Sequence, residues 1–361
     1  MANILYRGPL ERSRLSFLAE STAKAYGQTK LIWISPRRLT KQLVEHFQSF
    51  VHQNPWINDW EIVDGFIGAS PASILNLRRK LENRDAPLIA VGFTTIFYAG
   101  FIAKGKCIWC INGVPEEDLM QSQRAKQRLA VALEWQLARM ACVPDLVVTV
   151  SEPMNALVKK RCKAKAFFAA PNCVDSGTFA SPMPQPRRYM TYLGTGAAWQ
   201  GLDYLAQVWG ALHRLDPSLK FQVISRDKRA QVLGCKLPAD AIEFRGVQQP
   251  NEVAQLLWAA EAGFITREPH LVNEVSFPTK FGEYIAAGVY PVVTDLGWDL
   301  GQIIQKTGCG LLVPPKQAAE KVAEAVIAFR RGQVDINKRL QAAMELLDRR
   351  RWVERLAAAM P

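Results

Sequence analysis

The sequence has few of the residues that build metal centres and histidine-based catalytic sites. Among 361 residues there are four histidines, and the seven cysteines are an odd number, most of them inside apolar segments. This pattern favours buried free thiols over a disulfide framework. Cys107 and Cys110 have the spacing of a redox or zinc motif, but they lie in a predicted strand without a second ligand pair. We therefore expect no metal site and no permanently bound cofactor.

Long apolar runs are also missing. None reaches the roughly 18–20 residues that span a bilayer, and residues 1–7 are too short and too early charged for a signal peptide. We therefore expect a cytoplasmic protein. Apolar residues make up 49% of the chain and charged residues 22%, which allows two full cores and argues against disorder.

The net charge of +12 is large and basic residues are clustered, at positions 78–80, 124–128, 159–165 and 349–351. Solvated helix faces explain such clusters, but three partners also fit them: nucleic acid, an anionic membrane surface and phosphorylated substrates. We recognise no nucleic-acid-binding module and expect no nucleic-acid partner. Because three clusters lie in the first half, we hypothesise attraction to an anionic membrane, at the inner face of the plasma membrane.

Short strand-like runs alternate with helix-like segments from end to end, which predicts an α/β protein with parallel sheets. The length favours two domains. Four prolines within sixteen residues mark a linker. We therefore expect an N-terminal domain over residues 1–170, a linker over 171–187, a C-terminal domain over 188–340, and a final helix over 341–361 that crosses back to the first domain.

The expected elements follow this alternation in both halves. We predict strands near residues 3–7, 30–35, 61–63, 87–91, 106–111, 145–150, 166–169, 188–194, 219–225, 241–245, 262–266, 290–294 and 309–312. In the first half we predict helices near residues 12–26, 38–53, 71–82, 117–141 and 152–162. A helical tail follows over residues 316–359.

Residues 264–294 combine an apolar strand, a polar loop and a helix that begins near Pro278. Proline suits the first helical turn, whose free N–H groups and dipole attract an anion. Lys280 adds a positive charge, and Glu283 is placed to accept hydrogen bonds from ribose hydroxyls. This combination suits a nucleotide diphosphate, and the side chains that we expect to contribute are Arg267, Ser276, Thr279, Lys280 and Glu283.

Three segments resemble motifs of one enzyme family. Residues 141–152 read A-C-V-P-D-L-V-V-T-V-S-E, similar to the strand A-D-x-V-I-x-V-S-E; residues 171–175 read P-N-C-V-D, similar to P-N-G-V-D; and residues 277–291 resemble S-P-x-K-x-x-E-Y-L-A-x-G-x-P. Together with the two α/β halves, these motifs resemble the GT-B glycosyltransferases, and within them retaining family 4 (glycosyl transferases group 1). The resemblance is strongest over residues 130–315.

The resemblance implies two Rossmann-like domains that face each other across a cleft, followed by a C-terminal helical tail. The first domain would bind the acceptor and the second the nucleotide-sugar donor, which is a co-substrate. The implied activity is the transfer of a sugar from a nucleotide-diphosphate sugar to an acceptor hydroxyl with retention, without an obligatory metal. The basic first half suggests a glycan or lipid-linked acceptor, as in envelope polysaccharide or glycolipid assembly.

The sequence departs from the family pattern in two places. The motif G-R-x-x-x-x-K-G appears here as residues 194–201, so Thr195 and Gln200 replace the arginine and lysine that hold the diphosphate. Arg267 and Lys280 are the available substitute cations. The paired glutamates of the family are separated by seven residues, whereas eight separate Glu274 from Glu283. We keep Glu274 as a donor-sugar contact, since a loop can absorb the shift.

Further candidates come from the ends of predicted strands, where α/β sheets bind ligands. Backbone groups near Thr195 are expected to approach the phosphates, and Arg226 to meet a phosphate or base. The resemblance implies acceptor- and donor-facing catalytic residues at the strand end where Asn112 lies, although a helix-capping turn explains Asn112 equally well. The predicted donor contacts here are Gly194, Thr195, Gly196, Gln200, Arg226 and Val247. Two alternatives remain, a non-catalytic nucleotide-sugar or glycan-binding protein and a sugar-nucleotide epimerase of the same fold.

Overall fold

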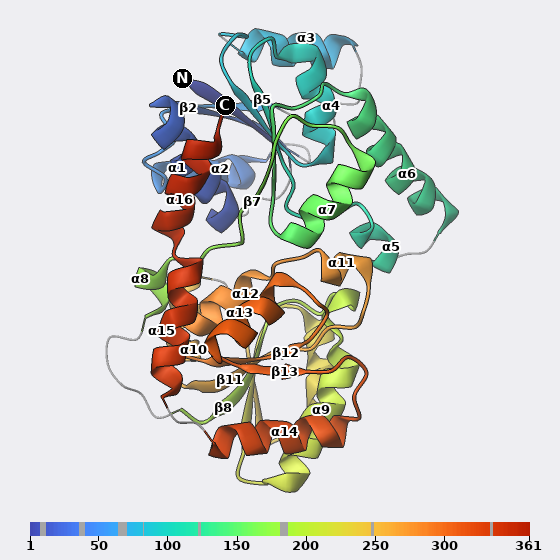
Figure 1. Cartoon of the computed structure of the whole chain (residues 1–361), viewed down its shortest axis with the longest axis vertical. Helices are drawn as coiled ribbons and strands as arrows, with labels where there is room; N and C mark the ends of the chain where they lie inside the picture. Colours follow the sequence, from blue (N-terminus) through green and yellow to red (C-terminus); the bar gives the residue numbers. More distant parts are fainter. Residues whose placement is uncertain are drawn as a thin grey trace. The chain divides into compact units, whose positions relative to one another are not determined.

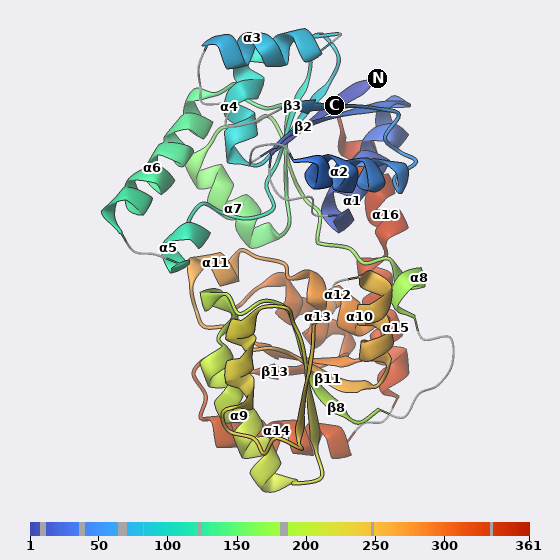
Figure 2. The same ribbon diagram turned by 180° about the vertical axis from the view of Figure 1, so that it is seen from behind.

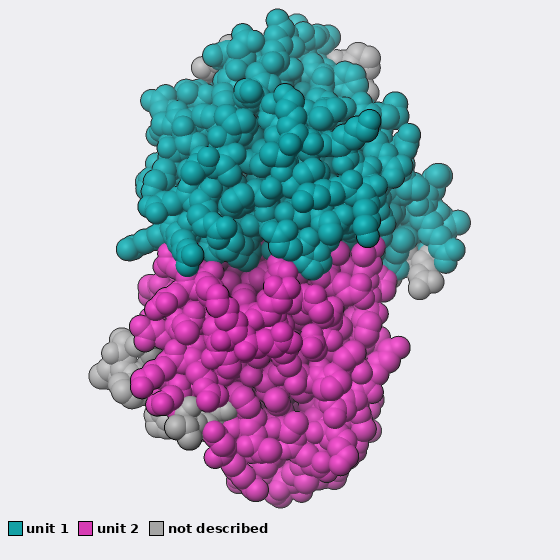
Figure 3. Space-filling view, viewed as in Figure 1, with its two compact units in different colours: residues 1–171, 349–361 teal, residues 172–348 magenta. Residues whose placement is uncertain are grey.

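The chain forms two units, each built around its own parallel sheet. The computed structural model describes residues 1–7, 12–35, 40–63, 71–81, 83–121, 124–180, 187–246, 249–332 and 335–361. Unit 1 comprises Met1–Pro171 and Arg349–Pro361, and unit 2 comprises Asn172–Asp348; Figure 3 shows them in teal and magenta. The predicted α/β class, with two Rossmann-like domains and a helical C-terminal region, is confirmed.

Unit 1 contains a seven-stranded sheet with the order β3-β2-β1-β4-β5-β6-β7, in which every neighbouring pair is parallel. The strands are β1 (Ala2–Arg7), β2 (Thr29–Ile34), β3 (Asp59–Val63), β4 (Leu88–Val91), β5 (Cys107–Cys110), β6 (Leu146–Thr149) and β7 (Phe167–Ala169). The central strands are apolar on both faces, as expected when helices cover both sides of a parallel sheet.

Helices cover the two faces of this sheet. The described helices of unit 1 are α1 (Arg12–Tyr26), α2 (Lys41–His52), α3 (Pro71–Lys80), α4 (Phe93–Ile102), α5 (Glu117–Gln121), α6 (Ala125–Met140), α7 (Glu152–Arg161) and α16 (Arg349–Ala359). Figure 1 shows α1, α2 and α16 on one side of the sheet and α4, α6 and α7 on the other. The α6 helix packs on α4.

Two helix predictions in this unit were wrong. The expected single helix over residues 117–141 is two helices, α5 and α6, and residues 122–123 between them lie outside the described part of the chain. The α4 helix, in turn, was not predicted from the sequence. Because α4 is apolar on nearly every side, with six of its residues buried, it has no amphipathic period by which to recognise it.

Unit 2 contains a six-stranded parallel sheet with the order β10-β9-β8-β11-β12-β13. The strands are β8 (Tyr189–Leu193), β9 (Lys220–Ile224), β10 (Ile242–Arg245), β11 (Ala260–Ile265), β12 (Tyr290–Thr294) and β13 (Leu311–Val313). Every strand of both units lies within two residues of its predicted range. The order reverses between β8 and β11, and such a switch point is where open α/β sheets bind ligands.

One face of the unit 2 sheet packs against α9 (Leu202–Leu215), the 3-10 helix η2 (Lys228–Gly234) and α14 (Ala319–Arg331), around a core that includes Trp209 and Phe264. The remaining elements are the 3-10 helix η1 (Ala198–Gln200) and the helices α8 (Ser176–Phe179), α10 (Pro250–Trp258), α11 (Leu271–Glu274), α12 (Thr279–Ala286), α13 (Asp299–Thr307) and α15 (Ile336–Leu347). Figure 2 shows α9 and α10 on opposite sides of the sheet.

The end of the chain is divided between the units. The α15 helix packs on α12 and α13 in unit 2, whereas α16 packs on α1 in unit 1, where Arg349 forms an ion pair with Glu20 at 2.8 Å. The predicted boundary at residue 340 therefore falls inside α15. Of the predicted linker, residues 172–180 and 187 belong to unit 2, and residues 181–186 lie outside the described part. No helix among the described residues has the length and apolar character needed to cross a membrane.

Candidate functional site

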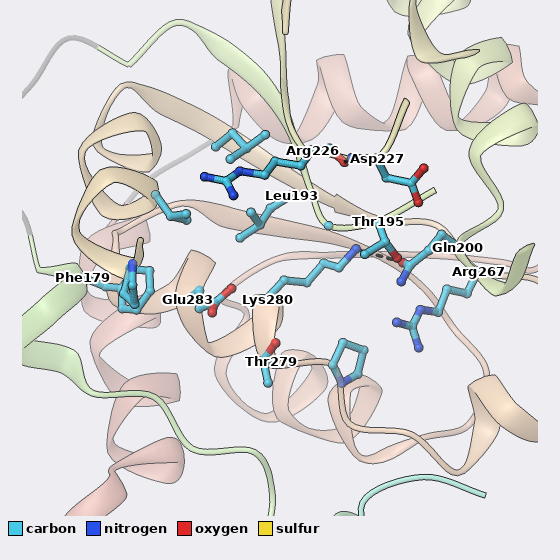
Figure 4. Close-up of a pocket in the computed structure, with 16 residues that line it drawn as sticks. Phe179, Leu193, Thr195, Gln200, Arg226, Asp227, Arg267, Thr279, Lys280 and Glu283 are labelled. Carbon is cyan, nitrogen blue, oxygen red and sulfur yellow. Dashed lines mark hydrogen bonds between the residues drawn. The ribbon is translucent and has the colours of Figure 1, made fainter. Parts of the chain in front are cut away.

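A pocket of about 630 Å³ opens in unit 2 at the switch point of the sheet. It lies among the loops that follow β8, β9 and β11 and the start of α12 (Figure 4). Its lining residues are Phe179, Leu193, Gly194, Thr195, Gln200, Ile224, Ser225, Arg226, Asp227, Pro250, Val253, Arg267, Pro278, Thr279, Lys280 and Glu283. The structure thus brings eight of the predicted site residues into one pocket: Gly194, Thr195, Gln200, Arg226, Arg267, Thr279, Lys280 and Glu283.

The α12 helix is held with its N-terminus at the pocket. Pro278, which we expected within the first helical turn, is instead the N-cap, with φ −63° and ψ 129°. The Tyr284 hydroxyl accepts the Leu193 N–H at 2.9 Å, which ties α12 to the end of β8. A Cβ at Gly263 would lie 2.4 Å from the Tyr284 ring, so only glycine lets β11 approach the helix this closely. These contacts place the N–H groups of a first helical turn, which lack intrahelical acceptors, at the pocket wall.

Lys280 reaches from α12 to the loop after β8. Its ammonium nitrogen lies 2.9 Å from Oε1 of Gln200 and 4.3 Å from the centre of the Tyr192 ring, and the residue is 6% exposed. Gly194 makes room for this nitrogen: it has φ +140°, and a Cβ there would lie 2.9 Å from the Lys280 Nζ. Figure 4 shows the lysine side chain crossing the pocket toward Thr195 and Gln200.

Burial perturbs the two charged groups of α12 in opposite directions. It lowers the pKa of Lys280 well below the ordinary lysine value, and the nearby Arg267 lowers it further. It raises the pKa of Glu283 to about 7, although Lys280 acts in the opposite sense. Both groups are therefore less stable in their charged forms than they would be in water. An anionic ligand beside Lys280 would offset the cost of its charge.

Arg267 follows β11 and is fixed by several contacts. Its Nη1 donates to Oγ of Ser276 at 2.8 Å, its backbone N–H donates to Oγ1 of Thr294 at 3.2 Å, and its guanidinium lies 5.9 Å from the centre of the Trp298 ring. Arg267 is 7% exposed and lines the pocket. Ser276 is not among the lining residues, so it orients Arg267 where we expected a direct ligand contact.

Asp227, which no sequence motif indicated, organises the loops at this end of the pocket. Its Oδ2 accepts the Gly196 backbone N–H at 2.8 Å and its carboxylate pairs with the Arg229 guanidinium at 2.7 Å. Hydrogen bonds from Arg229 hold the pKa of Asp227 well below its usual range. The Gly196 N–H, which we expected to approach a phosphate, is thus already engaged, and Gly196 is not a lining residue. The tyrosine hydroxyl of Tyr192 donates to the Thr195 carbonyl at 2.6 Å.

The opposite side of the pocket is more apolar. Phe179 comes from α8, and Pro250 and Val253 come from the first turns of α10. Arg226 extends from the end of β9 and donates from Nε to the Gly246 carbonyl at 2.9 Å. The predicted contact Val247 lies outside the described residues. No motif marks Phe179, because only the fold brings the segment after residue 171 to the switch point.

Two predicted site residues, Glu274 and Asn112, are not among the residues that line this pocket. Glu274 is the last residue of α11, is partly exposed and is not among the lining residues. Asn112 belongs to unit 1, where its Oδ1 accepts a hydrogen bond from Nε of Arg14 at 3.2 Å. In turn, Arg14 donates to the Ala170 carbonyl at 3.0 Å, so Asn112 is part of a buried polar network at the carboxyl ends of unit 1 strands.

Known proteins resemble this chain in sequence over unit 2 and in fold over both units. Residues 187–331 match the family model of glycosyl transferases group 1. No curated protein matches the sequence. Solved structures similar to this chain include Anabaena HepE in complex with UDP and glucose, with a TM-score of 0.73 and 14% identity over 99% of each chain.

Two further solved structures have the same architecture. A glycosyltransferase from Rickettsia africae has a TM-score of 0.70 and 14% identity, covering 99% of this chain and 97% of its own. Sucrose-phosphate synthase from Thermosynechococcus elongatus has a TM-score of 0.68 and 14% identity, covering 100% of this chain and 97% of its own. The chain therefore has the fold of the GT-B glycosyltransferases, and its residues 187–331 match the glycosyl transferases group 1.

Proposed function

We propose that the protein is a retaining glycosyltransferase that moves a sugar from a nucleotide-diphosphate sugar to an acceptor hydroxyl. The observation that carries this proposal is the convergence of Lys280, Arg267 and the N-terminus of α12 on one pocket at the switch point of unit 2. A diphosphate leaving group gains charge as the glycosidic bond breaks, and pre-positioned cations and N–H dipoles stabilise that charge. These groups suit that task.

The pocket also suits the rest of a nucleotide. Phe179, Pro250 and Val253 offer an apolar surface for a base, and Glu283, one helical turn after Lys280 on α12, can accept hydrogen bonds from ribose hydroxyls. Anabaena HepE has been solved with UDP and glucose and with UDP-glucose, and its similar fold favours a nucleotide-diphosphate sugar as the donor here.

The carboxylates among the described lining residues favour a mechanism without a protein nucleophile. Asp227 is engaged by Arg229 and Gly196, and Glu283 is assigned to the ribose. In our proposal the leaving phosphate therefore accepts the acceptor proton on the same face of the sugar as the new bond forms, which gives retention. Lys280 and Arg267 keep that phosphate oriented.

A screen for donor hydrolysis and transfer tests this proposal. The purified chain is incubated with nucleotide-diphosphate sugars and a panel of glycan and lipid-linked acceptors, and products are separated by mass and anomeric configuration. Transfer with retention is the expected result. Donor-induced thermal stabilisation without any product would instead identify a binding protein, and conversion of the donor sugar to its epimer without an acceptor would identify an epimerase.

We further propose that the acceptor is anionic or lipid-linked, as in envelope glycan assembly, and that unit 1 meets an anionic membrane surface. The α6 helix exposes three apolar side chains, Leu129, Leu133 and Met140, with exposures of 71%, 53% and 69%. Their spacing of four and seven residues puts them on one face, opposite the buried Val131 and Trp135. We call these three residues the α6 ridge.

Basic residues surround the α6 ridge, which supports an anionic surface as its partner. Lys126, Arg128 and Arg139 lie on the same helix and are exposed. An apolar stripe flanked by cations is the pattern of helices that lie in a membrane interface. Figures 1 and 2 show α6 at the outside of unit 1.

Sedimentation with vesicles tests the membrane proposal. The chain should bind phosphatidylcholine vesicles that contain phosphatidylglycerol and should bind pure phosphatidylcholine weakly. A Leu129→Gln, Leu133→Gln double variant should lose binding, whereas Leu75→Gln, at a leucine on α3 that is 50% exposed, should not. Equal binding to both vesicle types at low salt, or no effect of the double variant, would refute this part of the proposal.

A further inference from the structure

Two cysteines far apart in the sequence meet in unit 1. The sulfur atoms of Cys107 and Cys142 lie 3.5 Å apart. Cys107 is the first residue of β5 and is 5% exposed, whereas Cys142 follows α6 and is partly exposed. In the sequence, the CxxC spacing suggests Cys110 as the partner of Cys107. Side chains three residues apart on a strand point to opposite faces, however, and Cys142 is the neighbour that the fold provides.

Backbone contacts hold the two cysteines together. The Asp145 N–H donates to the Cys107 carbonyl at 2.7 Å, and the Cys107 N–H donates to Oδ2 of Asp145 at 2.9 Å. On the other side, a Cβ at Gly100 would lie 3.0 Å from the Cys142 nitrogen, so the absence of a side chain there lets the Cys142 segment lie against α4. The pair is therefore built into the packing of unit 1.

Cys142 faces a second pocket, of about 330 Å³. This thiol pocket is lined by Ala138, Arg139, Cys142, Val143, Arg161, Cys162 and Lys163. Three of these residues are cationic, and Arg139 and Lys163 are exposed. The hydrogen bond with Cys107 lowers the pKa of the Cys142 thiol, while the same contact and burial raise the pKa of Cys107. The accessible sulfur of the pair is thus the better nucleophile.

We infer that Cys142 is a thiol–disulfide exchange site for small anionic disulfides and that Cys107 is its resolving cysteine. In the first step the Cys142 thiolate attacks one sulfur of the small disulfide, so a mixed disulfide forms and one small thiolate leaves. In the second step Cys107, after losing its proton, attacks the Cys142 sulfur. The Cys107–Cys142 disulfide forms, the second small thiolate leaves, and the protein has lost two electrons to the small disulfide.

The charge of the thiol pocket selects the oxidant. Arg161 is ion-paired with Glu116, so the exposed Arg139 and Lys163 are the cations that favour a disulfide carrying carboxylates over one carrying amines. Glutathione disulfide is a suitable anionic probe, and cystamine is a cationic probe with the same reactive bond. Cys235 provides an internal control, because it is an exposed cysteine in unit 2.

The experiment treats the full chain with glutathione disulfide or cystamine, alkylates the remaining thiols and locates each modification by peptide mass spectrometry. We expect Cys142 to react several-fold faster than Cys235 with glutathione disulfide and to end as a Cys107–Cys142 disulfide. The Cys107→Ser and Cys107→Ala variants should instead accumulate the mixed disulfide on Cys142. The Arg139→Gln, Lys163→Gln double variant should lose the preference for glutathione disulfide over cystamine.

Several outcomes would overturn the inference. Reaction of Cys142 no faster than that of Cys235 would remove the exchange site. A mixed disulfide that persists on Cys142 in the wild type would remove the resolving role of Cys107. If the double variant still prefers glutathione disulfide over cystamine, the cations do not select the oxidant. Circular dichroism of each variant ensures that the comparison is made on folded protein.

Discussion

The ammonium nitrogen of Lys280 lies 2.9 Å from Oε1 of Gln200, although the two residues are 80 positions apart. In the glycosyltransferase motif that this sequence resembles, a lysine occupies the position of Gln200. Here the amide oxygen of Gln200 accepts a hydrogen bond from a lysine that arrives on α12. We propose that the cation serving the diphosphate has thereby moved from the loop after β8 to the helix.

Gln200→Lys should test this exchange. The variant would bring a second ammonium next to Lys280, and like charges in a partly desolvated site repel, so we expect the ligand-free protein to lose roughly 2 kcal/mol of stability. A nucleoside diphosphate should recover more stability in the variant than in the wild type, because it would neutralise both cations. Thermal unfolding with and without ligand measures both effects. Gln200→Met is the uncharged control; a similar loss there, with no larger ligand effect in Gln200→Lys, would contradict the account.

Gly194→Ala should disturb the position of Lys280. The residue has φ +140°, and the new Cβ would lie 2.9 Å from the Lys280 nitrogen and 3.2 Å from the Tyr192 hydroxyl. We expect a loss of about 1–3 kcal/mol from backbone strain and weaker nucleotide binding. Gly246→Ala is the matched control, since a Cβ there meets no atom of the described residues within 4 Å. Chemical denaturation of both variants checks the prediction, which fails if they behave alike.

Glu283→Gln should change how stability depends on pH. The pKa of Glu283 is raised from 4.5 to about 7 on folding. Between these values the unfolded chain loses the proton before the folded chain does, so the wild type loses stability as the pH rises from 4.5 to 7. Relative to the wild type, the variant should gain about 3 kcal/mol between pH 4.5 and pH 8, since one pKa unit corresponds to about 1.4 kcal/mol. Urea unfolding at the two pH values measures this difference, and a constant or decreasing difference would rule out the raised pKa.

Tyr284→Phe should weaken the attachment of α12 to the sheet. It removes the hydroxyl that accepts the Leu193 N–H, and an unsatisfied buried donor costs about 1–3 kcal/mol. Tyr290→Phe is the control, because the buried Tyr290 hydroxyl has no hydrogen-bond partner among the described residues. Its removal should be nearly neutral or stabilising. Equal losses of unfolding free energy in the two variants would show that the Tyr284 hydroxyl does not anchor the helix.

The sequence predicted the parts of this protein that depend on local patterns. Alternating apolar strands and amphipathic helices predicted the two sheets, and Pro278 together with Lys280 predicted a helix start with a cation close behind it. The α4 helix was not predicted because its apolar residues surround the helix and leave no polar face. The residues near Pro278 were recognisable because one short segment contains the whole pattern.

Contacts between distant segments could not be predicted from the sequence. Nothing local indicates that Gln200 accepts a hydrogen bond from Lys280, that Asp227 holds the Gly196 N–H, or that Phe179 lines the pocket. The pairing of Cys107 with Cys142 could not be predicted either, because the CxxC spacing indicates Cys110 as the partner of Cys107. Each of these relationships depends on which loops the sheet order brings together.

Calorimetric titration of nucleoside diphosphates and their parent nucleosides into the wild type and Lys280→Met tests the central claim most directly, with Lys306→Met, at an exposed lysine on α13, as the control. We predict that at least one diphosphate binds far more tightly than its nucleoside. Lys280→Met should weaken the binding of that diphosphate by about 10–100-fold, as expected for the loss of a charged hydrogen bond. The affinity for the nucleoside should change little. If no diphosphate is preferred over its nucleoside, or if Lys280→Met and Lys306→Met bind the diphosphate equally well, the claim that this pocket holds a diphosphate through Lys280 is contradicted.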